Sequence, residues 1–358
     1  MDADAPATIG TPTPVGMVAP VAPPSDVVMP EGFSQAPVVD PGWTMAPVEV
    51  DGVFLGVAEG VETTDGDVST QIRAVDSDGI VLWEVDAPPG ASLTTGRTPD
   101  GAPVALLATP ASPGATPSAV VVDVVHGGVL AGPVDLPGPV VGPGFVVDDG
   151  GTRLALDATT ALPRPGLATL ADGETVLLED GGTVLTAAPG RLPALGPDDA
   201  ELWTLSADEL GLEAGATPVA VAGAEPPAGT AVVGTPEDGA LVDLATGTVE
   251  AVGVRDARRD VSLGHLVALG VRTVSAHRAG EVLWSGPTTP DSRLGAVGGA
   301  LLYLREGEAV RVLNSLTGAH AQAWDSPGRG GLGVPSVMSS KGAAALWTDR
   351  WVVLTVSE

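Results

Sequence analysis

The sequence predicts an all-β fold, a β-propeller of four-stranded antiparallel blades. Short apolar strands recur along the chain, and no helical pattern of about ten residues or more interrupts them. Seven similar turns follow one another roughly 40 residues apart, a period typical of propeller blades. The 49 glycines and 34 prolines provide the many turns that such a fold needs, and 44% hydrophobic residues provide a large core.

The repeated unit is a strand of alternating polarity, a polar turn that ends in Gly, and a second strand. Seven segments have this pattern: 71–85, 119–134, 152–166, 201–215, 239–253, 272–286 and 309–324. The residues that end their turns are Gly79, Gly127, Ala161, Gly211, Gly247, Gly280 and Gly318. The clearest copies run from Asp123 to Gly127 and from Asp243 to Gly247, where Asp caps the turn and Gly accepts a positive φ.

A further short apolar strand precedes each of these hairpins. The strands are 53–58, 104–108, 145–147, 175–178, 230–234, 265–270 and 300–304. With a connecting strand, each unit reaches the four strands of a blade.

The segment DSDGIVLWEV (76–85) permits two interpretations, a metal loop or a hairpin turn. A calcium loop needs six or more oxygen ligands, whereas Asp76 and Asp78 provide two side chains before the next strand begins. The equivalent positions read DVVHG, DATTA, DLATG, HRAG and NSLTG, with one acid or none, so the turn recurs and the pair of acids does not. We therefore predict a blade turn with no metal site. Four dispersed histidines and the absence of cysteine also predict no metal, cofactor or catalytic residue.

The motif Asp-x-x-Thr-Gly, with Trp four residues beyond the Gly, resembles the quinoprotein-type (PQQ-like) β-propeller repeat over roughly residues 40–358. Trp83 follows Gly79 and Trp284 follows Gly280 at that spacing, whereas Trp324 lies six residues beyond Gly318. The resemblance implies that these tryptophans dock one blade against the next. Redox enzymes of that family hold a quinone with calcium and often carry a vicinal disulfide. Without cysteine that disulfide cannot form, and the family's catalytic residues do not transfer to this chain.

The termini are expected to close the ring. Segment 38–50, which contains Trp43, should pair beside the strands of 335–356 and so remove exposed sheet edges. Seven hairpins and this composite blade predict eight blades. Seven blades remain the alternative, because segment 167–215 is irregular and could itself be most of a blade. The propeller domain then covers residues 38–358, preceded by a Pro/Ala-rich flexible leader or tether over residues 1–37.

A net charge of −29 repels nucleic acid and anionic membranes, and the one basic cluster, VRDARRD (254–260), is expected to be a solvated loop. No apolar stretch is long enough to span a bilayer. The leader favours an extracytoplasmic location in a bacterial cell envelope, with a cytoplasmic one if Met1 is the natural start. The favoured function is a non-enzymatic scaffold for a protein partner. The alternatives are a propeller enzyme, either a minimal quinoprotein dehydrogenase or a propeller hydrolase or lyase, and a structural surface or particle protein.

Overall fold

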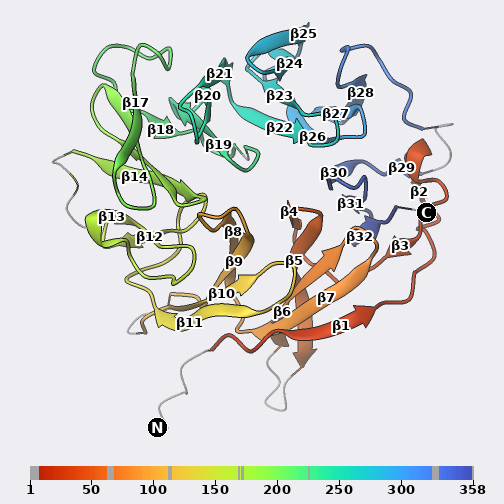
Figure 1. Ribbon diagram of the computed structural model, residues 1–358. Helices are drawn as coiled ribbons and strands as arrows, with labels where there is room; N and C mark the ends of the chain where they lie inside the picture. Colours follow the sequence, from red (N-terminus) through yellow and green to blue (C-terminus); the bar gives the residue numbers. More distant parts are fainter. Residues whose placement is uncertain are drawn as a thin grey trace.

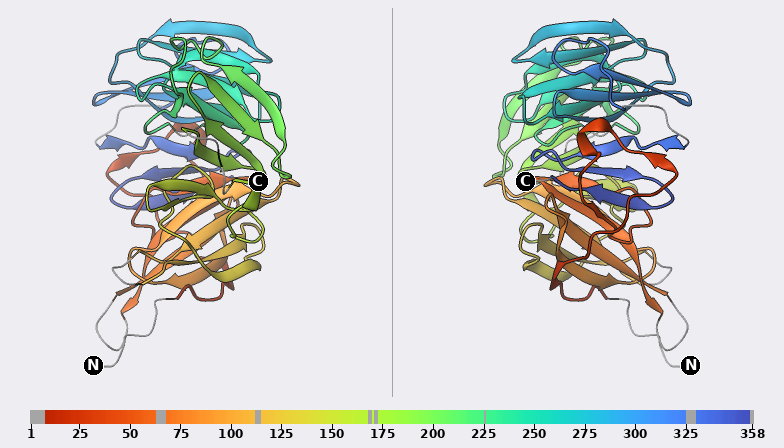
Figure 2. Two further views of the ribbon diagram at one scale, coloured as in Figure 1. Left: turned by 90° about the vertical axis from the view of Figure 1, so that its left-hand side faces the viewer. Right: turned by 90° about the vertical axis from the view of Figure 1, so that its right-hand side faces the viewer.

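The protein is an all-β propeller, in which radial sheets surround a central axis (Figure 1). The computed structural model describes residues 8–62, 68–111, 115–167, 170, 173–224, 226–324 and 330–356. Viewed from the side, the ring is a thick disc formed by the stacked edges of the blades (Figure 2). No helix within these described ranges has the length and apolar character needed to cross a membrane.

Seven antiparallel sheets of three or more strands form the blades of the described structure. Blade 1 comprises β4 (Val48–Val50), β5 (Val53–Glu62), β6 (Val68–Asp76) and β7 (Ile80–Ala87). Blade 2 comprises β8 (Ser92–Arg97), β9 (Pro103–Ala108), β10 (Ser118–Asp123) and β11 (Val129–Asp135). Blade 3 comprises β14 (Thr175–Asp180), β15 (Thr183–Ala187), β16 (Arg191–Leu195) and β17 (Glu201–Ser206). Blade 4 comprises β18 (Val219–Ala220), β19 (Thr230–Gly234), β20 (Gly239–Asp243) and β21 (Val249–Val254).

The remaining blades complete the ring. Blade 5 comprises β22 (Asp256–Asp260), β23 (His265–Leu269), β24 (Thr273–Arg278) and β25 (Glu281–Pro287). Blade 6 comprises the three strands β26 (Arg293–Gly298), β27 (Leu301–Glu306) and β28 (Ala309–Asn314). Blade 7 is β30 (Pro335–Met338), β31 (Ala344–Trp347), β32 (Trp351–Leu354) and, from the N-terminal side, β3 (Val38–Val39). The cluster expected to be a solvated loop at 254–260 is instead mostly strand β22.

The expectation of eight blades is wrong, because the segment expected as a blade near residues 145–166 forms only a two-stranded hairpin. This hairpin comprises β12 (Val146–Asp149) and β13 (Thr152–Ala155), with single bridges at either side, Val140 to Val147 and Leu156 to Pro163. Prolines at 137, 139, 143, 163 and 165 surround it, and proline lacks the N–H that a longer ladder requires. The innermost strands β8 and β14 contact each other directly, so the hairpin inserts no innermost strand between them. Segment 175–206, within the irregular region, supplies blade 3.

Blade 7 combines one strand from the N-terminal part of the chain with three strands from the C-terminal part. Val38 and Val39 of β3 pair with Leu354 and Val353 of β32, antiparallel, at the outer edge of the sheet. Trp43 lies outside this sheet, contrary to the expectation that it would stand beside the C-terminal strand. It bridges Ala58 of β5 and packs in a buried cluster shared by blades 7 and 1.

Residues of the predicted leader lie against the propeller. Strand β1 (Thr13–Met17) pairs antiparallel with β7 and makes a fifth strand of blade 1, as Figure 1 shows along its outer edge. Strand β2 (Val27–Val28) pairs in parallel with β29 (Gly331–Leu332), and a 3-10 helix, η1 (Glu31–Phe33), follows. A second 3-10 helix, η2 (Pro165–Leu167), lies between β13 and β14.

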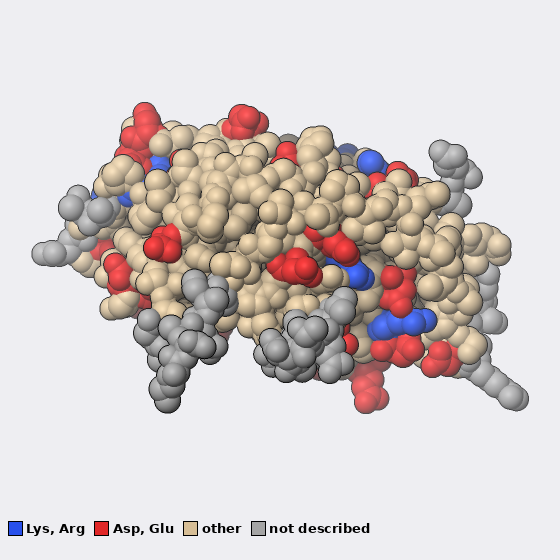
Figure 3. Space-filling model, turned by 90° about the horizontal axis from the view of Figure 1, so that it is seen from below, with Lys and Arg blue, Asp and Glu red and all other residues tan. Residues whose placement is uncertain are grey.

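The core is made of valine, leucine and alanine held between neighbouring blades. Strands β19 and β23 are buried along their whole length, as expected for strands covered on both faces. The outermost strands such as β25 are largely exposed. On the side of the ring in Figure 3, Asp and Glu are scattered among uncharged residues and form no continuous surface.

Candidate functional site

The repeated blade turns are held by the side chain of their first residue. Asp123 Oδ1 accepts hydrogen bonds from the N–H groups of Val125 and His126, each at 2.8 Å. The N–H of Gly127, at φ 69°, donates to the Asp123 carbonyl at 2.9 Å. Burial acts to raise the pKa of Asp123, but the bonds from His126 and Val125 outweigh burial and lower it.

The same arrangement recurs at Asp243, whose Oδ1 accepts from the N–H groups of Ala245 and Thr246 at 3.0 and 2.9 Å. Gly247 closes this turn at φ 71°, and Gly318 closes the turn that begins at Asn314 at φ 70°. A residue with a side chain is strained at these φ values, so Gly satisfies a backbone requirement there.

Asp76 acts within its own turn as well. Its Oδ1 accepts from the N–H groups of Asp78 and Ile80 at 3.0 and 2.9 Å, and Gly79 has φ 82°. The turn at Gly280 is shorter and places both Ala279 and Gly280 at positive φ, 51° and 78°.

Trp83 joins blade 1 to blade 2. Its side chain is fully buried, and its Nε1 donates to the Val124 carbonyl at 2.8 Å. The indole lies against Gly127, where an added Cβ would come within 2.7 Å of the ring. The turn glycine thus leaves room for the tryptophan of the preceding blade.

Trp284 makes the equivalent contact between blades 5 and 6. Its Nε1 donates to the Ser315 carbonyl at 2.8 Å, and its ring lies against Gly318. Trp324 makes a different contact, an edge-on stack with Tyr303 at 6.1 Å between ring centroids. Trp43 packs over Gly56 within blade 1.

The sequence analysis missed a third tryptophan of this kind, Trp203. Its Nε1 donates to the Leu244 carbonyl at 3.0 Å, and its ring lies against Gly247. Trp203 and Gly247 are separated in sequence by the same distance as Trp83 and Gly127. That equal spacing, from the tryptophan forward to the next turn, was the signal that could have found it.

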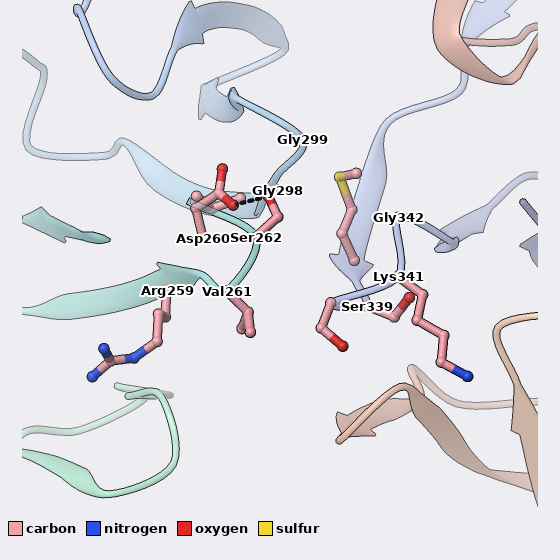
Figure 4. A pocket seen from close by; sticks show the side chains of 12 residues that line it. Arg259, Asp260, Val261, Ser262, Gly298, Gly299, Ser339, Lys341 and Gly342 are labelled. Carbon is pink, nitrogen blue, oxygen red and sulfur yellow. Dashed lines mark hydrogen bonds between the residues drawn. The ribbon is translucent and has the colours of Figure 1, made fainter. Parts of the chain in front are cut away.

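A pocket of about 250 Å³ lies where the innermost strands β22, β26 and β30 end and turn back into their blades (Figure 4). Its walls come from Arg259 to Ser262, Val297 to Gly299, and Met338 to Gly342. Arg259 and Lys341 lie on opposite sides of the opening, with Val261 and Ser339 between them. Sequence reasoning did not bring these residues together, although Arg259 belongs to the basic cluster and Lys341 is the only lysine.

Both oxygens of the one carboxylate in this pocket, that of Asp260, accept hydrogen bonds from neighbouring protein groups. Asp260 is fully buried, and its Oδ1 accepts from Ser262 Oγ at 2.6 Å and from the Leu263 N–H at 3.2 Å. Its Oδ2 accepts from the Ala300 N–H at 3.1 Å and from Ser315 Oγ at 3.3 Å. Asp260 therefore ties blade 5 to blade 6 beneath the pocket. No group of three or more possible metal ligands occurs among the described residues.

Glu179, at the corresponding end of β14, is a buried carboxylate with one bonded oxygen. Its Oε1 accepts from the Gly182 N–H at 2.9 Å, whereas Oε2 has no hydrogen-bond partner within the described structure. Burial raises the pKa of Glu179 to about 8, in spite of the Gly182 bond. Burial likewise raises the pKa of Glu49, at the end of β4, to about 7.

The raised pKa values of Glu179 and Glu49 predict that the free energy of unfolding falls as the pH rises. Glu179 holds its proton more tightly in the folded protein, where its pKa is about 8, than in the unfolded chain, where its pKa is 4.5. Its contribution to the free energy of unfolding is therefore complete below pH 4.5 and is lost as the pH rises to about 8. Each unit of such a difference corresponds to about 1.4 kcal/mol. Glu179→Gln should therefore be the more stable protein at pH 9 and should have a flatter profile, with Glu49 causing the residual slope. Denaturant unfolding at several pH values measures this difference.

Glu201→Gln, at an exposed position, is the matched control and should keep the slope of the wild-type protein. Parallel profiles for Glu179→Gln and wild type would show that Glu179 is ionised in the folded protein at neutral pH.

No protein-family model matches the sequence, and no curated protein matches it. Solved structures do match. Sqt1 of Chaetomium thermophilum, bound to the N-terminus of ribosomal protein L10, is 13% identical, with 92% of this chain and 98% of that chain covered and a TM-score of 0.40. PorZ of Porphyromonas gingivalis, a component of the type-IX secretion system, is 14% identical over 88% and 45%, with a TM-score of 0.38. AztD of Citrobacter koseri is 14% identical over 79% and 71%, with a TM-score of 0.31. At these values the comparisons identify no function.

Proposed function

We propose that the chain is a non-enzymatic β-propeller that binds a protein partner through the tip of the β31–β32 hairpin. The observation that supports this proposal is the exposure of Trp347: the chain has seven tryptophans, all within the described residues, and the other six are buried or partly buried. Half of its surface is accessible, at 50%. Tryptophan is enriched among the residues that dominate the energy of protein interfaces, because it buries a large area on binding.

The tip of this hairpin is held in place before any partner binds. Trp347 pairs in register with Trp351, and the two rings stack edge to face with their centroids 5.6 Å apart. Trp351 packs in turn against the buried cluster between blades 7 and 1. In the turn between them, the Thr348 N–H donates to the Arg350 carbonyl at 2.8 Å, and Arg350 pairs with Asp40 at 3.1 Å. A rigid anchor loses little conformational entropy on binding.

The charge of the chain favours a basic partner. With a net charge of −29, the propeller attracts positively charged proteins and repels acidic ones at long range. An extracytoplasmic location in a bacterial envelope, suggested by the composition of residues 1–37, forms part of this proposal. So does kinship with quinoprotein-type repeats, which the spacing of Trp83 and Trp284 supports.

Trp347→Ala tests the proposal. A protein is captured on the wild-type propeller, purified, and titrated against the wild type and the variant by calorimetry. We expect Trp347→Ala to weaken binding by tenfold or more, the effect of losing a dominant interface residue worth about 2 kcal/mol. Its melting temperature should stay close to that of the wild type, because the side chain is half exposed.

Leu202→Ala is the control, since Leu202 is also 50% exposed but lies on β17 in blade 3. Its affinity should equal that of the wild type. Equal binding by wild type and Trp347→Ala would place the contact surface elsewhere on the ring and overturn the proposed site.

A further inference from the structure

Asp260 and His265 form a buried pair at the turn between β22 and β23. They stand opposite each other in the antiparallel register of the two strands, so their side chains lie on the same face of blade 5. Both residues are buried, with exposed fractions of 0% and 1%. No hydrogen bond joins them, because both ring nitrogens of His265 lack a partner within the described structure.

The Asp260 carboxylate already accepts as many hydrogen bonds as its lone pairs allow. A carboxylate has about four acceptor sites. Four donors occupy them: Ser262 and Leu263 from the turn that Asp260 begins, and Ala300 and Ser315 from blade 6. The bond from Ser262 is the shortest at 2.6 Å (Figure 4), and the bond from Ser315 is the longest at 3.3 Å. A further donor to Asp260 must therefore displace one of these four.

The bonds from blade 6 are the easier ones to displace. Ser262 and Leu263 are kept close to Asp260 by the short turn that contains all three, whereas Ala300 and Ser315 belong to another blade. Ala300 also has φ 66°, an unfavourable backbone conformation for a residue with a side chain. Its bond to Asp260 thus helps to hold a strained turn, and that turn relaxes when the bond is lost.

His265 becomes the competing donor when its ring is protonated. The charged groups that face the ring are Asp260 and Arg278. Burial lowers the pKa of His265 from its ordinary value of 6.5, and the attraction of Asp260 only partly opposes this effect. The ring is therefore neutral at neutral pH and charged only in acid. Once charged, it attracts the carboxylate more strongly than neutral donors do.

We propose that Asp260 and His265 form an acid-sensitive latch between blades 5 and 6. When His265 takes a proton from solvent, its ring N–H donates to Asp260 and displaces the bonds from Ala300 and Ser315. The adjoining turn at Gly298 and Gly299 lines the pocket, so loss of the latch changes one wall of that pocket. The latch does not depend on the proposed function of the β31–β32 tip, and Trp347→Ala should leave it unchanged.

The effect of His265 on stability has the opposite sign to that of Glu179. Because the folded pKa of His265 is lowered, its contribution to the free energy of unfolding is complete above pH 6.5 and is lost as the pH falls below that value. Glu179 instead stabilises the folded protein in acid. Global unfolding measures the sum of both effects, so the test must be local. The Ala300 N–H is a local reporter, since it donates directly to Asp260.

The test is native-state hydrogen exchange of the full chain, followed by NMR at about pH 7.5 and about pH 5. Protection factors correct for the intrinsic pH dependence of exchange. We expect the protection of Ala300 to fall in acid by about tenfold to a hundredfold, the loss of one hydrogen bond to a charged group. The Gly318 N–H, in another turn of blade 6, donates to a backbone carbonyl and should keep its protection.

Two variants assign the effect to His265. His265→Gln removes the proton site and keeps a polar side chain, so Ala300 should be equally protected at both pH values. His277→Gln is the matched control, because His277 is also buried in blade 5 but faces Glu250 of blade 4. Its Ala300 N–H should respond to acid as that of the wild type does. Thermal unfolding at about pH 7.5 checks that each variant is folded.

The wild-type protein provides a second measurement, because the ring protons of His265 report its protonation directly. Variants of the exposed His126 and His320 assign the remaining resonances. We expect His265 to titrate over the pH range in which Ala300 loses protection. Three outcomes would overturn the proposal: an Ala300 N–H as protected in acid as at neutral pH, the same loss of protection in His265→Gln, or a His265 ring that stays neutral until the whole chain unfolds.

Discussion

Trp83→Ala is expected to lower the free energy of unfolding by about 3–5 kcal/mol, the range for removing a large aromatic side chain from a core. The indole is fully buried in a cluster that includes Leu107 and Val122 of the next blade. Its removal opens a cavity against Gly127 and leaves the Val124 carbonyl without the indole N–H. An unpaired buried acceptor adds about 1–3 kcal/mol to the cost. Equilibrium denaturation in urea, followed by far-ultraviolet circular dichroism, measures the loss.

Two further variants separate the contributions. Trp83→Phe keeps most of the packing and removes the hydrogen bond, so its stability should lie between those of wild type and Trp83→Ala. Trp347→Ala removes the same side chain from an exposed position and should cost far less. A Trp83→Ala protein as stable as Trp347→Ala would mean that the blade 1 and blade 2 contact is made by the aliphatic side chains alone.

The turns could be predicted from sequence because they are local. Asp123 and Gly127 lie four residues apart, and each bond that defines the turn is formed within that short segment. The same is true at Asp243 and Gly247. The repeat of such turns indicated a propeller, since a strand pair with a fixed period must be packed by its neighbours.

The number of blades could not be predicted in the same way. Whether segment 140–163 adds a full sheet depends on how many ladder bonds its prolines leave, and on whether β8 and β14 approach closely enough to touch. The second condition is a property of the closed ring. A count of hairpins in sequence cannot detect it.

Trp43 shows the limit of assigning a partner from position. Its segment was expected beside the C-terminal strand, and only Val38 and Val39 pair there. The chain turns at Pro41 and Gly42, and Gly42 has φ 73°, so Trp43 reaches β5 instead. The space above Gly56 that receives its ring was not evident from sequence.

The pocket depends on contacts between distant parts of the chain. Arg259 and Lys341 come from blades 5 and 7, and they share a cavity only because β26 of blade 6 places its Gly298 and Gly299 turn between them. Composition revealed that lysine is unique and that basic residues cluster once. Neither observation indicated that the two would meet.

Val353→Asp is expected to abolish the cooperative folding of the ring or to destabilise it by more than about 4 kcal/mol, because it places a carboxylate where the N-terminal strand β3 pairs with the C-terminal strand β32. Val353 is fully buried and pairs with Val39 of β3 on one side and Ala345 of β31 on the other. Its neighbours in the buried cluster include Trp43 and Phe54 of the adjoining region, so an ionised group there would have apolar contacts in place of water.

Val356→Asp provides the comparison, with the same substitution three residues further along at a position 43% exposed. It should unfold at nearly the denaturant concentration of the wild type, whereas Val353→Asp should lose stability and become sensitive to limited proteolysis, since opening one seam of a closed ring exposes two sheet edges at once. Lowering the pH should recover part of the lost stability of Val353→Asp, because a protonated aspartic acid is cheaper to bury than a carboxylate. If Val353→Asp and Val356→Asp unfold alike, the pairing of β3 with β32 does not hold the ring closed, and the remaining contacts between blades 7 and 1 must do so.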